Sequence, residues 1–481
     1  MRMRYAIVLM VLSLLVGAGL SYFFNGTGLA TGISSKESGN VMARTNTTTE
    51  KDIEKIKQVL DLISENYVEE VEEKDLIEGA ISGMVNTLED PYSVYMDKDT
   101  AHQFEESLDS TFEGIGAEVS MTEGKVTIVA PFKDSPAEKA GLKPNDKILT
   151  VDGESLSGLD LYEAVLKIRG EKGSVVTLEV ERPGVKEVFK VKVIRDEIPL
   201  ETVYSSIKDY NNKKVGYIEI TSFSEDTAVD FETQLAELET KNIAGLVIDV
   251  RGNPGGYLQS VEEILKLLVT KDKPYVQIEN RNGEKERFFS SLTEKKPYPI
   301  AVLIDNGSAS ASEILAGALK EAGGYEIIGE KSYGKGTVQQ AVPLSDGSNV
   351  KLTLFKWLTP DSNWIHEKGV EPTVEVKQPD YFYSSPIQLE EEALAFDMNN
   401  EKVKNAQLML KGIGFDPGRV DGYFSKQTEV AVQAFQKENG LTVNGQIDKQ
   451  TAAKLEEKII EQVKDEKNDY QLQTAIKMLF K

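Results

Sequence analysis

Residues 301–340, AVLIDNGSASASEILAGALKEAGGYEIIGEKSYGKGTVQQ, contain an apolar run, three alternating serines and a lysine between two glycines. The run at 301–304 predicts a buried strand, and residues 313–320 have the spacing of a helix that Gly323 and Gly324 end. The serines therefore lie at a strand-to-helix turn. Such a turn exposes unpaired backbone N–H groups and the positive end of the helix dipole, which stabilise an alkoxide or an oxyanion. A serine here is either a nucleophile or a helix cap, and position alone favours the cap.

A nucleophilic serine needs a base to accept its proton, and the chain contains few residue types that can act as one. There is no cysteine, which excludes cysteine nucleophiles and zinc–thiolate sites, and the only histidines are His102 and His366. Burial lowers the pKa of a lysine, and a neutral lysine can accept a serine proton. Lys335, between Gly334 and Gly336 after an apolar strand, is the candidate for such a base. The alternatives are a surface lysine in a glycine turn and a histidine base.

Three long motifs follow one another along the chain: DVRGNPGG at 249–256, SASASE at 308–313 and IGEKSYGKGTVQQ at 328–340. Together they resemble the C-terminal processing peptidases, the tail-specific serine proteases of family S41 with a Ser/Lys centre. Carried over by position, the resemblance implies that Ser310 is the nucleophile, Lys335 the general base and Gln339 the residue that orients the lysine. Ser308 and Ser312 are then helix-start residues.

Strands and helices alternate along the segment that contains these motifs, which predicts an α/β layer structure. The resemblance implies that this segment, residues 199–385, is a protease core similar to ClpP and crotonase. The glycines that follow Asp249 form either a plain turn or a turn that aims N–H groups at a developing oxyanion. We therefore expect Gly255 or Gly256 to join the N–H of Ala311 in an oxyanion hole.

Residues 105–198 contain the segments GIGAEV, SPAEKAGL and NDKILTVDG and a predicted helix at 161–168, in the order of a PDZ domain, which they resemble. Backbone N–H groups of a glycine-rich loop can hold the C-terminal carboxylate of a peptide while the peptide adds a strand to the sheet. Arg169, just past the helix, reaches a carboxylate or the neighbouring domain, or is simply solvated. We expect the carboxylate-binding loop at Gly114, Ile115, Gly116 and Ala117.

The N-terminus predicts a membrane anchor or an export signal. Residues 1–25 carry Arg2 and Arg4 and then about twenty residues without a charge, which is long enough to span a bilayer as a helix. A cleavable signal peptide, after which the protein is secreted, is the alternative. The long apolar run without a clean cleavage site favours a single-pass anchor in the cell membrane, with the catalytic part extracytoplasmic. Residues 26–49, rich in Gly, Ser, Thr and Asn, predict a flexible linker.

Helices are predicted at both ends of the remaining chain. Residues 50–104 have amphipathic helical patterns, and residues 465–481 contain an apolar stripe. In the family such terminal helices pair in homodimers, and packing within one chain is the alternative. Residues 400–457, between the core and the C-terminal helix, resemble a small helical peptidoglycan-binding domain. The residues that match this domain, most of them expected to support its fold, are Asp421, Gly422, Phe424, Thr428 and Phe435.

The sequence thus predicts a multidomain α/β protein with N-terminal helices, a PDZ domain, a protease core and a peptidoglycan-binding domain. The formal net charge of −24 argues against nucleic acid as a partner. The resemblance implies a serine endopeptidase that captures the exposed C-terminal tails of protein substrates and needs no metal or cofactor. In domain order the chain resembles the B-type enzymes of spore-forming Gram-positive bacteria, which implies cleavage of a membrane-associated sporulation regulator.

Two other classes of function remain open from the sequence. The first is an inactive scaffold whose PDZ and peptidoglycan-binding domains tether partners to the wall, which the joint presence of Ser310, Lys335 and Gln339 disfavours. The second is acyl-CoA chemistry on a crotonase-like core, in which a PDZ domain and an export segment have no role.

Overall fold

A computed structural model describes residues 50–481, except residues 107–109, 123, 133, 160, 184, 186, 388 and 390–391. The expected anchor and linker, residues 1–25 and 26–49, lie outside the described residues. Within the described part of the chain, no helix is long and apolar enough to cross a membrane.

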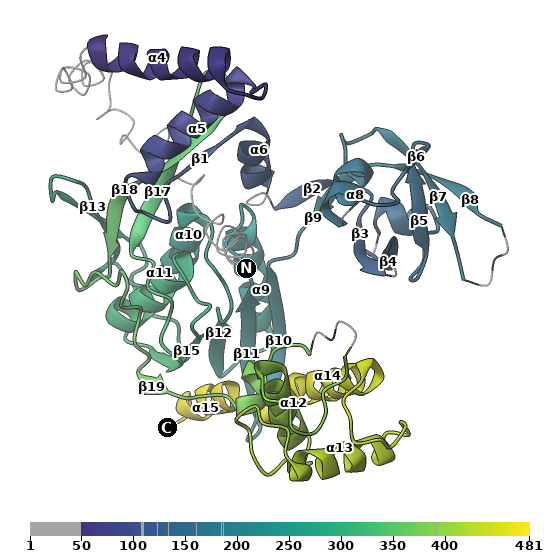
Figure 1. Cartoon of the computed structure of the whole chain (residues 1–481). Coiled ribbons are helices and arrows are strands. Elements are labelled where there is room, and N and C mark those ends of the chain that lie inside the picture. The colour runs from purple at the N-terminus through teal and green to yellow at the C-terminus, as the bar shows by residue number, and fades with distance from the viewer. Residues whose placement is uncertain are drawn as a thin grey trace.

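The centre of the molecule is a six-stranded sheet in the order β10-β11-β12-β15-β16-β19 (Figure 1). The strands are β10 (Val203–Tyr210), β11 (Lys213–Ile220), β12 (Gly245–Asp249), β15 (Ile300–Ile304), β16 (Glu326–Gly329) and β19 (Val374–Glu375). All pair in parallel except β10, which is antiparallel to β11. Parallel strands need crossover connections, and the helices between them are α9 (Thr227–Thr240), α10 (Leu258–Leu268) and α11 (Ala311–Ala318), which continues as the π-helix η2 (Leu319–Gly323).

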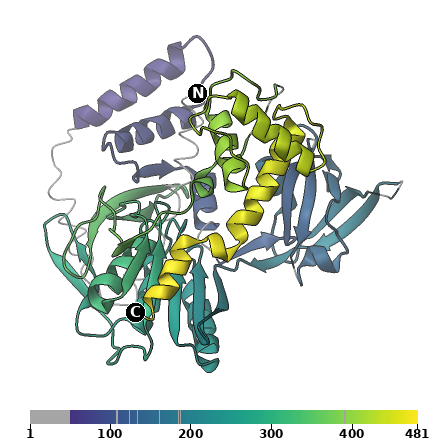
Figure 2. The ribbon, with the colours of Figure 1, turned by 90° about the horizontal axis from the view of Figure 1, so that it is seen from below.

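Both faces of this sheet are covered. The helices α9, α10 and α11 pack on one face around a core that includes Ile248, Val302 and Leu315. The C-terminal helix α15 (Tyr470–Met478) covers the other face with the stripe Leu472, Ala475, Ile476 and Leu479. Every residue of β12 and β15 is therefore buried, which explains their continuous apolar sequences. Figure 2 shows α15, in yellow, lying across the core, so this stripe packs within its own chain.

A second sheet joins the N-terminal region to the core. It runs in the order β1-β18-β13-β14, and β17 also pairs with β18. Its strands are β1 (Val94–Met96), β13 (Pro274–Glu279), β14 (Lys285–Phe289), β17 (Thr337–Pro343) and β18 (Asn349–Leu358). The helices of the N-terminal region are α4 (Glu50–Asn66), α5 (Glu73–Asn86) and α6 (Lys98–Glu106). Large apolar side chains of α4 are more than half exposed: Ile53, Ile56 and Leu62.

A β-rich domain stands to one side of the core (Figure 1). Its sheet has the order β3-β4-β5-β7-β8, with β6 beside β5. The strands are β3 (Ala117–Thr122), β4 (Lys125–Pro131), β5 (Lys147–Val151), β6 (Glu154–Ser155), β7 (Val175–Glu181) and β8 (Phe189–Ile194), and the helices are α7 (Pro136–Lys139) and α8 (Leu161–Ile168). The antiparallel ribbon of β2 (Thr111–Gly114) and β9 (Asp196–Pro199) connects it to the core. The ribbon is fastened where the Ser110 hydroxyl accepts from the backbone N–H of Asp226, at 2.6 Å.

A small helical domain lies between β19 and α15. It consists of α12 (Glu401–Gly412), α13 (Lys426–Glu438) and α14 (Lys449–Lys464), and the turns η3 (Asp380–Tyr383) and η4 (Glu466–Asn468) lead into and out of it. Phe424, Thr428 and Phe435 are fully buried in this domain, as expected of residues that support the fold. The chain then returns to the core as α15.

Candidate functional site

The three serines of SASAS have different surroundings. The Ser308 hydroxyl donates to the carbonyl of Val250 at 2.7 Å, and the Ser312 hydroxyl donates to the carbonyl of Asn253 at 2.9 Å. The Ser310 hydroxyl donates to no group in the described part of the chain. Ser310 also has φ 54° and ψ −112°, a backbone conformation that residues other than glycine rarely adopt and that is typical of functional turns. Ser310 is the N-cap of α11 and its side chain accepts within a capping box with Glu313, so it is the serine whose hydroxyl proton, rather than its oxygen, is not used to hold the fold.

The glycines after Asn253 lie directly against this turn. A Cβ atom at Gly255 would lie 3.0 Å from the Cβ of Ser310 and 3.1 Å from the backbone nitrogen of Ala311, so a side chain here would press on the serine turn. Both glycines have positive φ, 112° at Gly255 and 144° at Gly256, which also favours glycine. The N–H of Gly255 donates to Asn253 Oδ1 at 2.8 Å. Among the described residues, the N–H groups of Gly256 and Ala311 have no acceptor, so these two are available to an oxyanion.

The glycine turn is anchored from the C-terminal end of the chain. Arg251 donates to Asp249 Oδ2 at 2.6 Å and to Asp469 Oδ2 at 2.8 Å. Asp469 also caps α15, because its Oδ1 accepts from the backbone N–H of Leu472 at 2.9 Å. The C-terminal helix thus holds the turn that carries Gly255, a connection across more than 200 residues that the sequence pattern does not reveal.

Glu313 connects the serine turn to the lysine loop. It is fully buried, and its carboxylate accepts four hydrogen bonds of 2.6–2.9 Å. The donors are the backbone N–H groups of Ser310, Gly334 and Lys335 and the hydroxyl of Ser332. Burial raises the pKa of Glu313, and these donors oppose the shift because they stabilise the charged form. One carboxylate therefore fixes the backbones of both candidate catalytic residues. Sequence reasoning missed this role, although Glu313 is at the helix position where a capping glutamate is expected.

Lys335 lies in an environment that favours the neutral amine. Only 4% of it is exposed. Burial, and after it the positive charge of Lys351, lowers the pKa of Lys335 to about 7, while Glu313 and Asp90 act in the opposite direction. Its amino group has no hydrogen-bond partner in the described part of the chain and lies over the ring of Tyr92, 4.8 Å from the centroid. Tyr92 was not singled out from the sequence.

Gln339 is buried on β17, but no hydrogen bond joins its side chain to the lysine amine. Its Nε2 donates to the hydroxyls of Thr337 and Thr353, each at 3.0 Å. Its Oε1 is buried without a hydrogen-bond partner. Leaving a buried carbonyl oxygen without a hydrogen bond costs free energy. Gln339 Oε1 can therefore gain by accepting from an N–H donor such as the Lys335 amine.

His366 packs against the lysine loop rather than against Ser310. Its Nδ1 lies 3.4 Å from the backbone nitrogen of Gly336, which donates to it. Its ring stacks on Trp364 with a centroid distance of 5.2 Å. His366 is therefore placed to support the loop, and it is the histidine to test if Lys335 is not the base.

The loop expected to bind a carboxylate has free donors. The carbonyl of Ile115 accepts from Ala137 N–H at 2.7 Å, and that of Gly116 accepts from Phe132 N–H at 2.9 Å. The N–H groups of Ile115 and Gly116 have no acceptor within the described ranges. The Arg169 side chain lies beside this loop, because a Cβ atom at Gly114 would be 3.6 Å from Arg169 Cγ. The loop thus adjoins a cationic side chain, and its residues Ile115 and Gly116 present N–H groups without an acceptor among the described residues.

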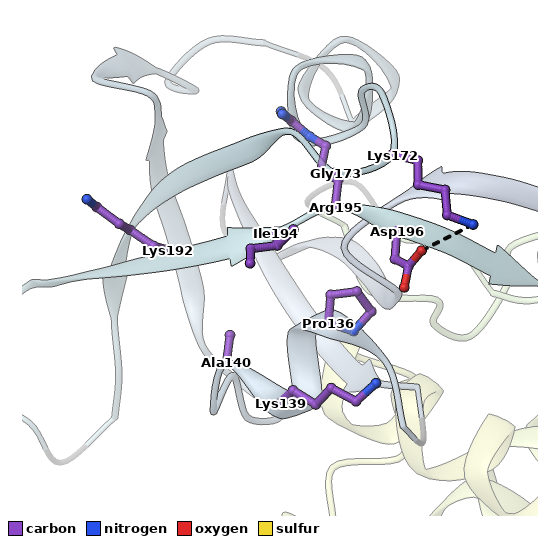
Figure 3. A pocket seen from close by; sticks show the side chains of 9 residues that line it. All are labelled: Pro136, Lys139, Ala140, Lys172, Gly173, Lys192, Ile194, Arg195 and Asp196. Carbon is purple, nitrogen blue, oxygen red and sulfur yellow. Dashed lines mark ion pairs between the residues drawn. The ribbon is translucent and has the colours of Figure 1, made fainter.

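A cavity of about 500 Å³ in the same domain lies between α7 and the strands β8 and β9 (Figure 3). Two of its cationic side chains, Lys172 and Arg195, already have partners. Lys172 pairs with Asp196 at 3.6 Å, and Arg195 donates to the carbonyls of Ile168 at 2.8 Å and Lys167 at 3.2 Å. Arg195 therefore closes the C-terminal end of α8 and has a structural role in this cavity.

Family models match successive parts of the chain. Peptidase family S41 matches residues 214–376, a PDZ domain matches 114–193, and a peptidoglycan binding domain matches 399–455. The N-terminal domain of the activating protease CtpB matches residues 14–100.

Curated relatives match almost the whole chain. The carboxy-terminal processing protease CtpB of Bacillus subtilis (strain 168) is 60% identical over 472 residues, which cover 97% of this chain and 98% of the relative. The carboxy-terminal processing protease CtpA of the same organism is 39% identical over 473 residues, with 98% of each chain covered. A solved structure of the photosystem II D1 C-terminal processing protease is 26% identical with a TM-score of 0.43, and the match covers 68% of this chain and 94% of that one. The chain thus belongs to peptidase family S41 and is a serine peptidase of the carboxy-terminal processing type.

Proposed function

We propose that Ser310 and Lys335 form the catalytic centre of this peptidase. The neutral amine of Lys335 takes the proton of the Ser310 hydroxyl as the oxygen attacks the substrate carbonyl, and the oxyanion accepts from the N–H groups of Gly256 and Ala311. Lys335 then gives the proton to the leaving amine, and water releases the acyl group by the same steps. The observation that carries the proposal is the Glu313 carboxylate, which holds the backbone N–H groups of both Ser310 and Lys335.

The described arrangement is a resting one in this proposal. The Lys335 amine lies over Tyr92, and Gln339 Oε1 lacks a donor. Turning the lysine side chain away from the ring would let the amine donate to Gln339 Oε1 and accept from Ser310. Gln339 then has the orienting role that the family resemblance implies.

Glu313→Gln is expected to lower turnover about 10- to 100-fold, because a misplacement of about 1 Å near a catalytic group can cost about 100-fold. The amide nitrogen of glutamine cannot accept from the N–H groups that the carboxylate now binds. The measurement is kcat and KM for a peptide substrate, with the melting temperature as the test of folding. Glu321→Gln, in the last turn of the same helical stretch, is the control. Unchanged turnover in Glu313→Gln would remove the shared carboxylate from the mechanism.

We further propose that the PDZ domain selects substrates by their C-terminal carboxylate. The free N–H groups of Ile115 and Gly116 and the adjacent Arg169 side chain support this recognition. Amidating the C-terminus of a tail peptide removes the negative charge, so binding is expected to weaken markedly. The measurement compares acid and amide forms of one apolar tail peptide on the protein from about residue 47. Equal binding of both forms would leave the loop as an ordinary glycine turn.

Deleting residues 113–195 separates recruitment from gating. A domain that only recruits would leave the cleavage of short peptides intact. A domain that gates the site would change their cleavage as well, upward if it blocks the site and downward if it supports it. Cleavage of a short peptide by the deletion variant, compared with the intact protein, distinguishes the two roles.

The location and assembly of the protein are part of the same proposal. Residues 1–25 anchor the chain in the cell membrane with the peptidase outside the cytoplasm, and the helical domain binds peptidoglycan, as its family match suggests. The exposed apolar side chains of α4, Ile53, Ile56 and Leu62, support a homodimer through the N-terminal helices. Since α15 is occupied by its own sheet, the C-terminal stripe does not offer a second such surface. Cleavage of a sporulation regulator rests on the family resemblance alone.

A further inference from the structure

The N-terminal region contributes directly to the surroundings of the proposed base. Strand β1 pairs with β18, where Val94 lies opposite Lys351. The segment just before β1 contains Asp90 and Tyr92, and it lies at the catalytic centre rather than on the outer face of the helical region. The ring of Tyr92 is 4.8 Å from the amino group of Lys335, the only cation–π contact that Lys335 makes among the described residues.

The Tyr92 ring is held in place from several sides. Its hydroxyl lies close enough to that of Tyr333 for the two to interact electrostatically, and its backbone N–H donates to Asp90 Oδ1 at 3.1 Å. His366 meets the ring edge-on at a centroid distance of 6.2 Å. Because Tyr92 is fixed before substrate arrives, its π face is a preformed site for the lysine ammonium.

The same segment is tied to the strand pair that carries Gln339. The Ser93 hydroxyl donates to Asp90 Oδ2 at 2.6 Å and accepts from the backbone N–H of Thr353 at 3.0 Å. The Thr353 hydroxyl in turn accepts from Gln339 Nε2 at 3.0 Å. The position of Tyr92 is therefore fixed relative to both Lys335 and Gln339.

The charged groups around Lys335 do not provide it with an ion-pair partner. Lys351, from β18, opposes its positive charge, whereas Glu313, from α11, and Asp90 favour it. Glu313 is occupied by four other donors, and the Asp90 carboxylate is occupied by Ser93 Oγ and the backbone N–H of Tyr92. The aromatic face is thus the group that contacts the ammonium directly.

We propose that Tyr92 is a positioning residue whose ring holds the charged form of Lys335 in the resting site and so sets the pH above which the lysine acts as a base. The proposal rests on the role of Lys335 proposed above. A cation–π contact stabilises the ammonium and not the neutral amine, so weakening the contact makes the lysine lose its proton at lower pH.

Fluorinated phenylalanines at position 92 test this without changing the shape of the ring. Each fluorine withdraws electrons from the π face and weakens the cation–π contact. The acid limb of the pH profile is the range in which kcat/KM rises with pH as Lys335 loses its proton. Relative to Tyr92→Phe, this limb is expected to move to lower pH with each added fluorine, by about half a pH unit to one pH unit in total. Tyr92→Leu, which removes the ring, is expected to move the limb in the same direction. A merely structural role would lower the rate at every pH and leave the limb in place.

The matched control is the same fluorinated series at Phe396, whose ring faces the Lys426 amino group at 4.1 Å in the helical domain. Fluorination at position 396 is expected to leave the acid limb of the kcat/KM profile at the same pH. A limb that does not respond to fluorination at position 92, in an enzyme that Lys335→Arg inactivates, overturns the role of Tyr92 alone. Substantial activity in Lys335→Arg would overturn the lysine base and this proposal together.

Discussion

Ser310→Ala is expected to abolish peptide cleavage while the protein remains folded. Removing the nucleophile of a serine peptidase typically costs about a millionfold in turnover. Alanine and serine are equally strained at φ 54°, and the Ser310 hydroxyl donates to no described group, so the fold loses little. The measurement is the rate of cleavage of a tail peptide, together with the melting temperature of the variant.

Ser308→Ala and Ser312→Ala are the matched controls. Each removes a hydroxyl that donates to a backbone carbonyl, so each is expected to cost on the order of 1 kcal/mol of stability and to keep most of the activity. Full activity in Ser310→Ala would contradict the assignment. Loss of activity in Ser308→Ala alone, in a folded protein, would move the nucleophile to that residue.

The fold class followed from local signals that the structure confirms. The apolar run of β15 predicted a buried strand, and α8 occupies the helical range that the sequence predicted. These features are readable because each element carries its own periodicity and ends at its own glycines. The serine turn, the glycine turn and the lysine loop could likewise be identified from motifs that lie within single loops.

The contacts that join these loops could not be predicted from local sequence. The Glu313 carboxylate accepts from backbone N–H groups about 20 residues further along the chain. The residue types in the sequence do not show which backbone N–H groups will donate to a side chain. Tyr92 reaches Lys335 only because β1 is added to β18. Asp469 reaches Arg251 only because α15 returns to the sheet. Such pairings depend on how the elements are arranged in space, which sequence spacing does not encode.

The covering of the sheet by α15 also changes how the C-terminal stripe is interpreted. From the sequence, packing within the chain and pairing in a dimer were equally open for Leu472, Ile476 and Leu479. The stripe is buried against its own β strands, and the helix that carries it also places Asp469 against Arg251. The C-terminal helix is therefore part of the support of the glycine turn, although the small helical domain separates it from the core in sequence.

Lys335→Arg is expected to be as inactive as Lys335→Ala, because arginine stays protonated and cannot accept the serine proton. In the unmodified enzyme, burial and the charge of Lys351 lower the pKa of Lys335 to about 7. The neutral fraction of the lysine, and with it kcat/KM, should therefore rise about tenfold per pH unit below about pH 7 and level off above about pH 8. The measurement is the pH profile of kcat/KM for a peptide whose own groups do not titrate in this range.

The buried neighbour Lys351 supplies the matched control. Its replacement should shift the acid limb in the direction opposite to the shift expected for the variants of Tyr92. Lys351→Met removes a positive charge that disfavours the ammonium of Lys335, so the acid limb should move to higher pH while the enzyme stays active. If the acid limb stays at the same pH in Lys351→Met, a group other than Lys335 controls it. If Lys335→Arg kept substantial activity, the base would most simply be His366, which lies against the backbone N–H of Gly336 in the same loop. His366→Gln, which keeps an acceptor for that N–H but cannot take the serine proton, would then abolish cleavage, whereas the variant should stay active if Lys335 is the base.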